Sequence, residues 1–118
     1  MTRHIGFKQE QVALNFLKKK GLKLISQNFS NKGGEIDIIM KDIKNNEIIF
    51  IEVKYRKSNL YGTAAEMVTY QKQQKIINTS IYFLKKHNLY DKIPIRFDII
   101  AINNDPISPI EWIQNAFS

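Results

Sequence analysis

Two apolar segments in the first half of the chain contain or adjoin five ionisable residues, although charged side chains are costly to bury. The segments read EIDIIMK, residues 35–41, and EIIFIEVKY, residues 47–55. The ionisable residues are Glu35, Asp37, Glu52, Lys54 and Arg56. An Asp followed at a distance by Glu-x-Lys is the pattern with which metal-dependent phosphodiesterases bind a cation and stabilise a phosphate. These residue types therefore fit phosphodiester hydrolysis, provided that the fold brings them together.

The segment DIKNN, residues 42–46, separates the two apolar segments and is rich in residues that favour turns. We therefore expect a β-hairpin, and a four-residue loop would place Asp42 opposite Glu47. Two further pairs follow from that register: Asp37 with Glu52, and Glu35 with Lys54. A shift of one residue would instead put these partners on opposite faces of the sheet.

Carboxylates that face each other across the hairpin would repel, because directly opposed Cβ atoms lie about 4.5 to 5.5 Å apart. Ile39 and Phe50 share the predicted face and would partly exclude water, which makes two charges there more unfavourable. A divalent cation between Asp37 and Glu52 would remove the conflict. The chain has no cysteine, so oxygen atoms would hold the metal, and such ligands favour Mg²⁺ or Mn²⁺.

Lys54 follows Glu52 by two residues, so it shares the face of Glu52 and lies roughly 7 Å farther along the strand. An ammonium there could orient a water nucleophile or stabilise charge that develops on a phosphate. A purely structural interpretation stays open, in which Glu35 and Lys54 form an ion pair worth less than about 1 kcal/mol. Asp37 and Glu52 would then lie at a solvated end of the sheet. The glycine pair at residues 33–34 allows close approach of backbone or substrate and favours a functional site.

Helices and strands are predicted on both sides of the hairpin. Apolar residues with helical spacing predict two helices, and β-branched or alternating segments predict two further strands. The helices cover about residues 6–20 and 70–87, and the strands cover residues 22–29 and 93–102. Residues 58–65 look irregular, and SPIEWIQNAF, residues 108–117, predicts a short terminal helix with Pro109 near its first turn.

The order αβββαβ predicts an α/β fold with one mixed sheet and helices packed against it. Both faces of residues 47–55 are apolar, which is typical of an interior strand. Asp98 lies in the last predicted strand, and we expect its carboxylate to hydrogen-bond within the sheet or to a neighbouring helix end.

Composition places the chain among ordinary globular proteins and suggests an anionic partner. At 118 residues, with 43% hydrophobic and 25% charged residues, residues 1–118 are expected to form one domain. The net charge of +7 favours nucleic acid first and a membrane surface second. The initial MTRHIGFKQEQ lacks the apolar core of a signal peptide, and no apolar run approaches the roughly 18 residues of a membrane span. A cytoplasmic location without membrane binding is therefore expected.

The segments GGEIDII and FIEVKYR, residues 33–39 and 50–56, resemble the YraN family of small bacterial proteins. The resemblance extends over nearly the whole chain, including GFKQEQVALNFLKKKGLKLISQNF, YGTAAEMV, Lys72, Lys75 and RFDIIAI. It implies a restriction-endonuclease-like fold of the PD-(D/E)xK nuclease superfamily, similar to archaeal Holliday-junction resolvases. The implied activity is Mg²⁺- or Mn²⁺-dependent cleavage of DNA, with branched DNA as one candidate substrate.

In that superfamily an Asp and a Glu on adjacent strands hold the metal, a Lys follows the Glu by two, and a Glu from the first helix often completes the metal ligands. The resemblance assigns these roles to Asp37, Glu52, Lys54 and Glu10. A structural alternative for Glu10 is that it favours the positive end of its helix. Three positions depart from the family's usual residues: Ile36 and Ala64 stand in place of Pro, and Gln9 stands in place of Gly.

Basic residues near the predicted site are expected to contact nucleic acid. Arg56, Lys57, Lys72 and Lys75 could line a track for phosphates. Glu35 would act as a base or ligand behind the metal, or pair with Lys54, and we favour the pairing. Action on a two-fold symmetric Holliday junction would require a homodimer. The competing hypotheses are a non-catalytic nucleic-acid-binding or scaffold module and a protein-interaction domain.

Overall fold

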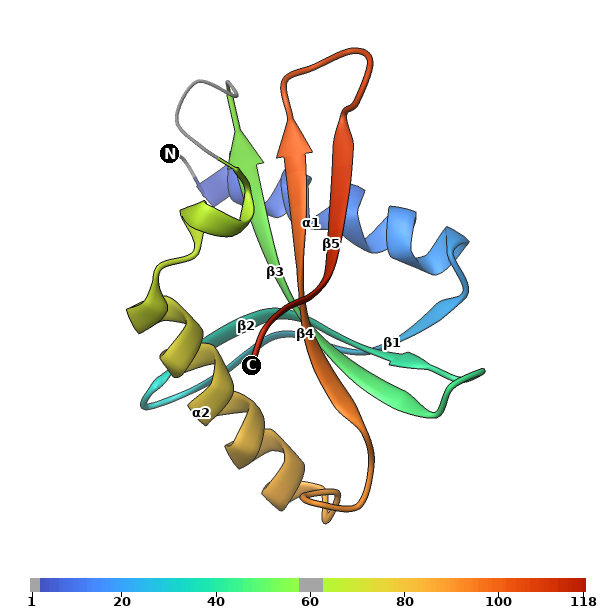
Figure 1. Ribbon diagram of the computed structural model, residues 1–118, viewed down its shortest axis with the longest axis vertical. Helices are drawn as coiled ribbons and strands as arrows, with labels where there is room; N and C mark the ends of the chain where they lie inside the picture. The colour runs from blue at the N-terminus through green and yellow to red at the C-terminus, as the bar shows by residue number, and fades with distance from the viewer. Residues whose placement is uncertain (1–2, 58–62) are drawn as a thin grey trace.

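The computed structural model describes residues 3–57 and 63–118, and the side chains of the first helix from Lys8 onward. The elements follow the order α1 (Arg3–Lys19), β1 (Leu22–Asn31), β2 (Gly34–Asp42), β3 (Glu47–Arg56), α2 (Tyr70–Lys86), β4 (Ile95–Asn103) and β5 (Ile110–Phe117) (Figure 1). A short 3₁₀ helix, Ala65–Met67, precedes α2. Neither described α-helix is long and apolar enough to cross a membrane.

The described strands form one mixed sheet in the order β1-β2-β3-β4-β5. Strand β3 pairs parallel with β4, and the other neighbours are antiparallel. A parallel pair needs a crossover connection, and helix α2 lies in the connection from β3 to β4. The predicted α/β fold with a mixed sheet is confirmed, and β3 is an interior strand as its two apolar faces indicated. This architecture is compatible with a restriction-endonuclease-like fold.

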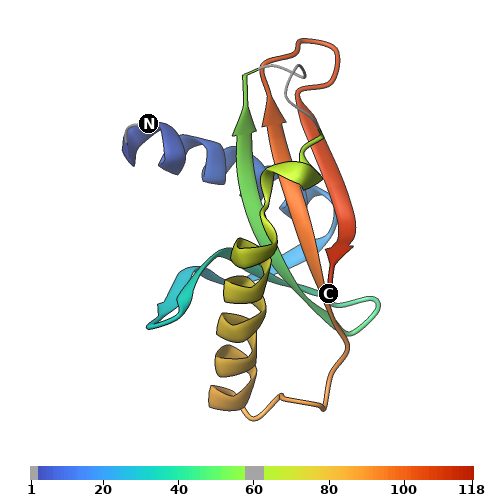
Figure 2. The ribbon, with the colours of Figure 1, turned by 60° about the vertical axis from the view of Figure 1, so that its left-hand side comes forward.

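The two helices cover opposite faces of the sheet, and the alternation of side chains along β3 decides which residues each helix meets. Ile49 and Ile51 pack in the hydrophobic core beneath α1. Ile48 and Phe50 pack in a second core beneath α2. The sheet twists strongly, so that β1 and β2 run at a steep angle to β4 and β5 (Figures 1 and 2). Strand β3 therefore joins both cores and carries the residues of the predicted site.

The C-terminal segment is a strand, so the short helix predicted for residues 108–117 was wrong. Strand β5 pairs antiparallel with β4. Ile110 and Trp112 pack in the α1 core, whereas Ile113 and Phe117 pack in the α2 core. An apolar segment this short does not distinguish a helix from a strand by its periodicity, so pairing with β4 decides. Of the segment predicted to be irregular, residues 58–62 lie outside the described residues.

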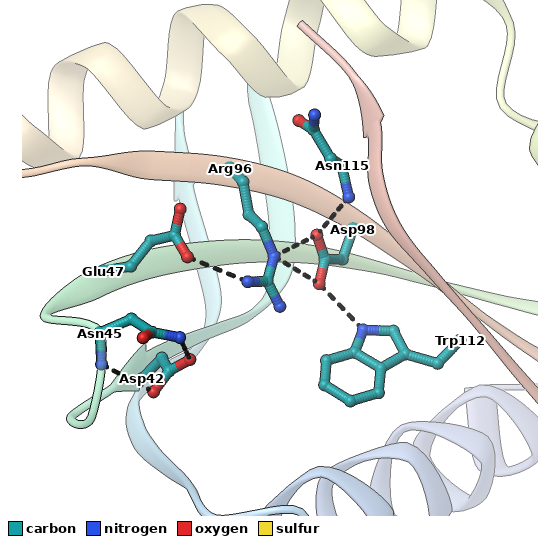
Figure 3. Close-up of polar contacts among 7 residues, drawn as sticks. All are labelled: Asp42, Asn45, Glu47, Arg96, Asp98, Trp112 and Asn115. Atoms are coloured by element: carbon teal, nitrogen blue, oxygen red, sulfur yellow. Dashed lines mark hydrogen bonds and ion pairs between the residues drawn. The ribbon is translucent and has the colours of Figure 1, made fainter.

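A buried polar cluster joins β3, β4 and β5 around Asp98 (Figure 3). Asp98 is fully buried on β4 and accepts hydrogen bonds from Arg96 Nε (3.0 Å), Trp112 Nε1 (2.9 Å) and the backbone N–H of Asn115 (2.9 Å). Arg96 Nη1 also donates to Glu47 on β3 at 2.9 Å. The bond to Asn115 forms where the register of β4 and β5 shifts and where Asn115 has a φ of 51°. The expectation that Asp98 hydrogen-bonds within the sheet is confirmed.

Replacing Asp98 should destabilise the whole sheet. Asp98→Asn keeps the size of the side chain but turns one acceptor into a donor that faces Arg96 or Trp112. Because this leaves a buried charge and a buried N–H poorly paired, we expect the free energy of unfolding to fall by about 3 kcal/mol. Urea denaturation followed by circular dichroism measures the change. Asp91→Asn alters an exposed residue with a φ of 61°, which Asn also tolerates, and should leave stability nearly unchanged. Equal effects of the two substitutions would show that the hydrogen bonds of Asp98 do not stabilise the sheet.

Candidate functional site

Strand β2 loses its regular geometry at Asp37. Its pairing with β3 follows the register predicted from the turn as far as Ile38 and Ile51, and ends there. Ile36 packs in the α2 core, but Ile38 packs in the α1 core, so side-chain alternation breaks between them. Two residues that are two positions apart would share a face in a regular strand. Asp37 therefore lies where the regular alternation of side chains along β2 is broken.

The Asp37 carboxylate reaches across to β3 through its side chain. The backbone N–H of Val53 donates to Asp37 Oδ2 at 2.8 Å. The predicted pairing of Asp37 with Glu52 as backbone neighbours is not formed in the described strands, because this hydrogen bond takes its place. Glu35 is not opposite Lys54 either, because the pairing of β2 with β3 does not extend beyond Ile38; the backbone of Glu35 pairs with Ser30 on β1. The hairpin register was predicted correctly near the turn and wrongly beyond Ile38.

Glu52 is a buried carboxyl on β3 with incomplete hydrogen bonding. Its residue is 4% exposed, and Oε1 has no hydrogen-bond partner among the described residues. Oε2 lies 3.7 Å from Lys54 Nζ and 3.7 Å from Lys72 Nζ. Burial, the largest cause, and the nearby charge of Asp37 together raise the pKa of Glu52 to about 8, against the opposing effects of Lys72 and Lys54. A side-chain hydrogen-bond interaction with Asp37 contributes to the same increase in the pKa of Glu52.

The interaction between these two carboxyls means that they act as one unit. A second negative charge close to Asp37 and shielded from water is unfavourable, so the charge of Asp37 is one of the causes that raise the pKa of Glu52. The fold thus brings Asp37 and Glu52 together as the sequence predicted, although by a different backbone route. Lys54 is also beside Glu52, as its position two residues farther along the strand predicted.

Glu10 on α1 lies near Asp37 and is tied to β1 by Asn28. With the Asn28 amide nitrogen turned toward the carboxylates, it donates to Glu10 Oε1 at 2.9 Å and to Glu35 Oε1 at 3.1 Å. The pKa of Glu10 is raised to about 7. Burial is the largest cause and the charge of Asp37 the second, whereas the hydrogen bond from Asn28 acts in the opposite direction. The fold therefore places Glu10, Asp37 and Glu35 on one side of the molecule.

Asn28 is a site residue that the sequence did not identify. It has a φ of 52°, in the left-handed region where Asn is one of the better tolerated residues. Asn28 has this conformation within β1, where its side chain meets Glu10 and Glu35. The local sequence QNF reads only as a polar position within a strand, so the single available signal was the tolerance of Asn for this conformation.

Asp37 and Glu52 offer a donor set that fits Mg²⁺ or Mn²⁺. These ions are often bound by one or two carboxylates, with waters and substrate oxygens as the remaining ligands. A cation would also satisfy Glu52 Oε1, the buried oxygen that has no partner within residues 3–57 and 63–118. No group of three His, Cys, Asp or Glu in that part of the chain is arranged to hold a metal. Glu10 is thus near Asp37 but does not complete a three-ligand cluster with Asp37 and Glu52.

The four basic residues predicted to contact nucleic acid have different environments. Arg56 has a side chain only 10% exposed, and it donates to Asn103 Oδ1 (3.0 Å) and Glu111 Oε1 (3.1 Å). It thereby links the ends of β3, β4 and β5. Lys57 and Lys75 are exposed. Lys72 on α2 points its ammonium toward the buried carboxyl of Glu52.

The close approach allowed by the glycine pair is made by helix α2. A Cβ added at Gly34 would lie 3.1 Å from Thr79 Oγ1 and 3.2 Å from Lys75 Cβ, closer than side chains normally pack. Gly33 has more space, with Asn31 Oδ1 at 3.6 Å from such an atom. Gly34 therefore lets α2 pack directly on the start of β2, which brings the N-terminal half of the helix alongside the site.

Comparison with known proteins identifies similar chains of the same length. The model of the uncharacterised protein family UPF0102 matches residues 9–102. A UPF0102 protein of Legionella pneumophila (strain Corby) is 42% identical, over 99% of this chain and 97% of its own length. UPF0102 proteins of Coxiella burnetii (strain RSA 331 / Henzerling II) and Vibrio parahaemolyticus are each 44% identical, over 98% of this chain and 93% of theirs. None of these names states an activity.

The stability of the metal-free protein should depend on pH through Glu52. Its folded-state pKa of about 8 lies above the unfolded value of 4.5, so the folded state keeps a proton that the unfolded state releases. The contribution of this carboxyl to stability therefore decreases as pH rises from 4.5 to about 8 and changes little above that range. The slope for one proton cannot exceed about 1.4 kcal/mol per pH unit.

Urea unfolding in EDTA at about pH 5, 7 and 9 measures this dependence. Glu52→Gln removes the titrating group and should give a flatter profile than the natural chain, while all other titrating groups are kept. Parallel profiles of the two proteins would show that the pKa of Glu52 is not raised in the folded state.

Proposed function

The chain belongs to the UPF0102 family, which is the YraN family, and we propose that it is a metal-dependent nuclease that hydrolyses phosphodiester bonds in DNA. The observation that carries this proposal is the contact of Asp37 with Glu52 on the central strand. Glu52 is buried, one of its oxygens has no partner among the described residues, and Lys54 lies beside it. Two carboxyls and a lysine in this arrangement suit a cation that binds a phosphate.

Each residue would have a separate part in hydrolysis. A bound Mg²⁺ or Mn²⁺ would polarise the phosphate and make a bound water more acidic. Asp37 and Glu52 would supply the metal with oxygen ligands, and Glu52 would bind in its ionised form. Lys54 would orient the water or stabilise the negative charge that develops on the phosphate. Glu10, held by Asn28 on the same side of the molecule, would bind through a water or after a small movement of its side chain.

Binding of DNA is supported by charge near this site. The chain carries a net charge of +7. Lys57 and Lys75 are exposed, and the N-terminal end of α2, which is the positive end of the helix dipole, lies beside the site. Phosphate contacts of this kind position DNA without reading its sequence. Arg56 would serve indirectly, since its bonds to β4 and β5 fix the strand end from which Lys57 extends.

A non-catalytic nucleic-acid-binding or scaffold module is the second candidate function. Two observations favour it. No three-residue metal cluster is formed in the described part of the chain, and the ammonium groups of two lysines already lie 3.7 Å from Glu52 Oε2. In that case the charge pattern would bind DNA without cleaving it. A role on four-way junctions would further require a homodimer, because the junction has two-fold symmetry.

Asp37→Asn and Glu52→Gln should reduce metal-dependent DNA cleavage by at least about a hundredfold, because each substitution removes a charged ligand. DNA affinity should stay within about threefold, because phosphate contacts come mainly from basic residues elsewhere. Cleavage is measured with Mg²⁺ and with Mn²⁺ on labelled four-way junctions, single strands and duplexes. Binding is measured by fluorescence anisotropy in EDTA.

Asp91→Asn is the matched control, because it changes an exposed carboxylate outside the site and should cleave like the natural chain. Absence of cleavage by the natural chain on every substrate and with both metals would reject the nuclease proposal. Salt-dependent binding that neither EDTA nor Glu52→Gln alters, without any cleavage, would support the non-catalytic module.

A further inference from the structure

Lys72 contacts the site from a different element than the other site residues. Its Nζ lies 3.7 Å from Glu52 Oε2, the same oxygen that Lys54 Nζ approaches at 3.7 Å. Glu52 belongs to the central strand, whereas Lys72 belongs to the first turn of α2. The ammonium of Lys72 therefore links the helix to the buried carboxyl across the side of the sheet that α2 covers.

Helix stability does not explain a lysine at this position. The backbone N–H of Lys72 donates to the side chain of Thr69, which caps the start of α2. Cations are unfavourable near a helix N-terminus, and the first turn of α2 contains no acidic residue that would compensate. The buried carboxyl of Glu52, with the adjacent Asp37, is the anion that Lys72 meets.

We propose that Lys72 is a counter-ion of the adjacent Asp37 and Glu52 carboxyls in the metal-free site, that a divalent cation displaces it from Glu52 Oε2, and that its ammonium then contacts a DNA phosphate. This role rests on the proposed binding of a metal and DNA at the site. It differs from a constant phosphate contact because the lysine has two alternative partners. It also makes Lys72 a positioning residue, since it acts on the metal ligand before substrate is bound.

The chemistry of lysine suits this exchange of partners. A divalent cation held by Asp37 and Glu52 would lie within a few ångströms of the ammonium, and the two positive charges would repel. Lysine has a flexible stem and three hydrogen-bond donors, so its ammonium can move without moving the helix. The side chain of Lys72 is 40% exposed, so solvent and a phosphate can reach it. Lys54 instead belongs to β3 itself, two residues from Glu52 in sequence.

The first test measures Mn²⁺ affinity without DNA, by calorimetry on the full chain. Lys72→Met keeps an unbranched side chain but removes the competing charge, so Mn²⁺ should bind about three- to tenfold more tightly. Lys85→Met is the matched control. It removes the same charge from the same helix, roughly 20 Å away along the axis, where salt screens the interaction. Its Mn²⁺ affinity should stay within about twofold of the natural chain.

Lys72→Gln guards against an artefact of the Met side chain and should also bind Mn²⁺ more tightly than the natural chain. Far-ultraviolet circular dichroism verifies that all variants are folded. Unchanged or weaker Mn²⁺ binding in both folded Lys72 variants would overturn the counter-ion role.

The second test measures how DNA affinity depends on salt, in EDTA and in Ca²⁺, with the DNA verified to be uncut on a denaturing gel. In Ca²⁺, Lys72→Met should lower the salt slope by about one, because one phosphate contact is lost. In EDTA the slope should not change, because Lys72 is then paired with Glu52. An equal loss in both conditions would identify Lys72 as a constant phosphate contact and overturn the exchange.

These measurements separate failure of this inference from failure of the proposed function. If the natural chain and Lys72→Met bind Mn²⁺ equally, and Glu52→Gln abolishes that binding, the metal site stands and the role of Lys72 is rejected. If no variant binds Mn²⁺, both are rejected. If the expected differences in metal affinity and salt slope occur without any DNA cleavage, the exchange stands and only catalysis is rejected.

Discussion

The burial of Glu52 is the constraint on which the rest of the site depends. A carboxyl that is removed from water and lacks a full set of donors is costly, and a second carboxyl beside it adds to the cost. Two features lower this cost: the raised pKa of Glu52 favours its uncharged form, and two ammonium groups lie at Glu52 Oε2. Under the proposed function, a divalent cation would replace both. The metal-free arrangement would then be an electrostatic substitute for the metal-bound one.

The backbone around this carboxyl departs from regular structure where the site needs it. The break in alternation at Asp37 turns its carboxylate toward the backbone of β3, and the left-handed Asn28 on the neighbouring strand holds Glu10. Gly34 lets α2 pack against β2 without a Cβ between them. Such irregularities in strands are common where a side chain must be re-aimed. Strand β2 and helix α2 therefore both reach Glu52 where the regular pairing of β2 with β3 ends.

Local patterns predicted the framework and the principal side chains but not the route by which they meet. The turn formers at residues 42–46 correctly set the hairpin register, because a short loop leaves few alternatives. That register could not be extended to Asp37, since the prediction assumed regular pairing and the irregularity depends on contacts with two neighbouring strands. The C-terminal strand was mistaken for a helix because β4 decides its conformation. The bond from Arg56 to Glu111 joins residues far apart in sequence, and no local pattern encodes it.

A comparison of the two buried carboxyls within the sheet indicates which one is better suited to bind a cation. Asp98 and Glu52 are both almost inaccessible to solvent. Asp98 receives donors from Arg96, Trp112 and the backbone of Asn115, so both of its oxygens are satisfied and it serves the packing of β4 and β5. Glu52 has one oxygen without a donor among the described residues, although the same sheet has the means to satisfy a buried carboxylate fully. A buried carboxyl oxygen without a donor is unfavourable for stability. Here it lies next to a second carboxyl and near two lysines, and such a position is favourable for binding a cation. Arg96 connects the cluster around Asp98 to Glu47 on β3. This bond helps to hold the strand that carries Glu52, although burial of the Glu52 carboxyl is unfavourable.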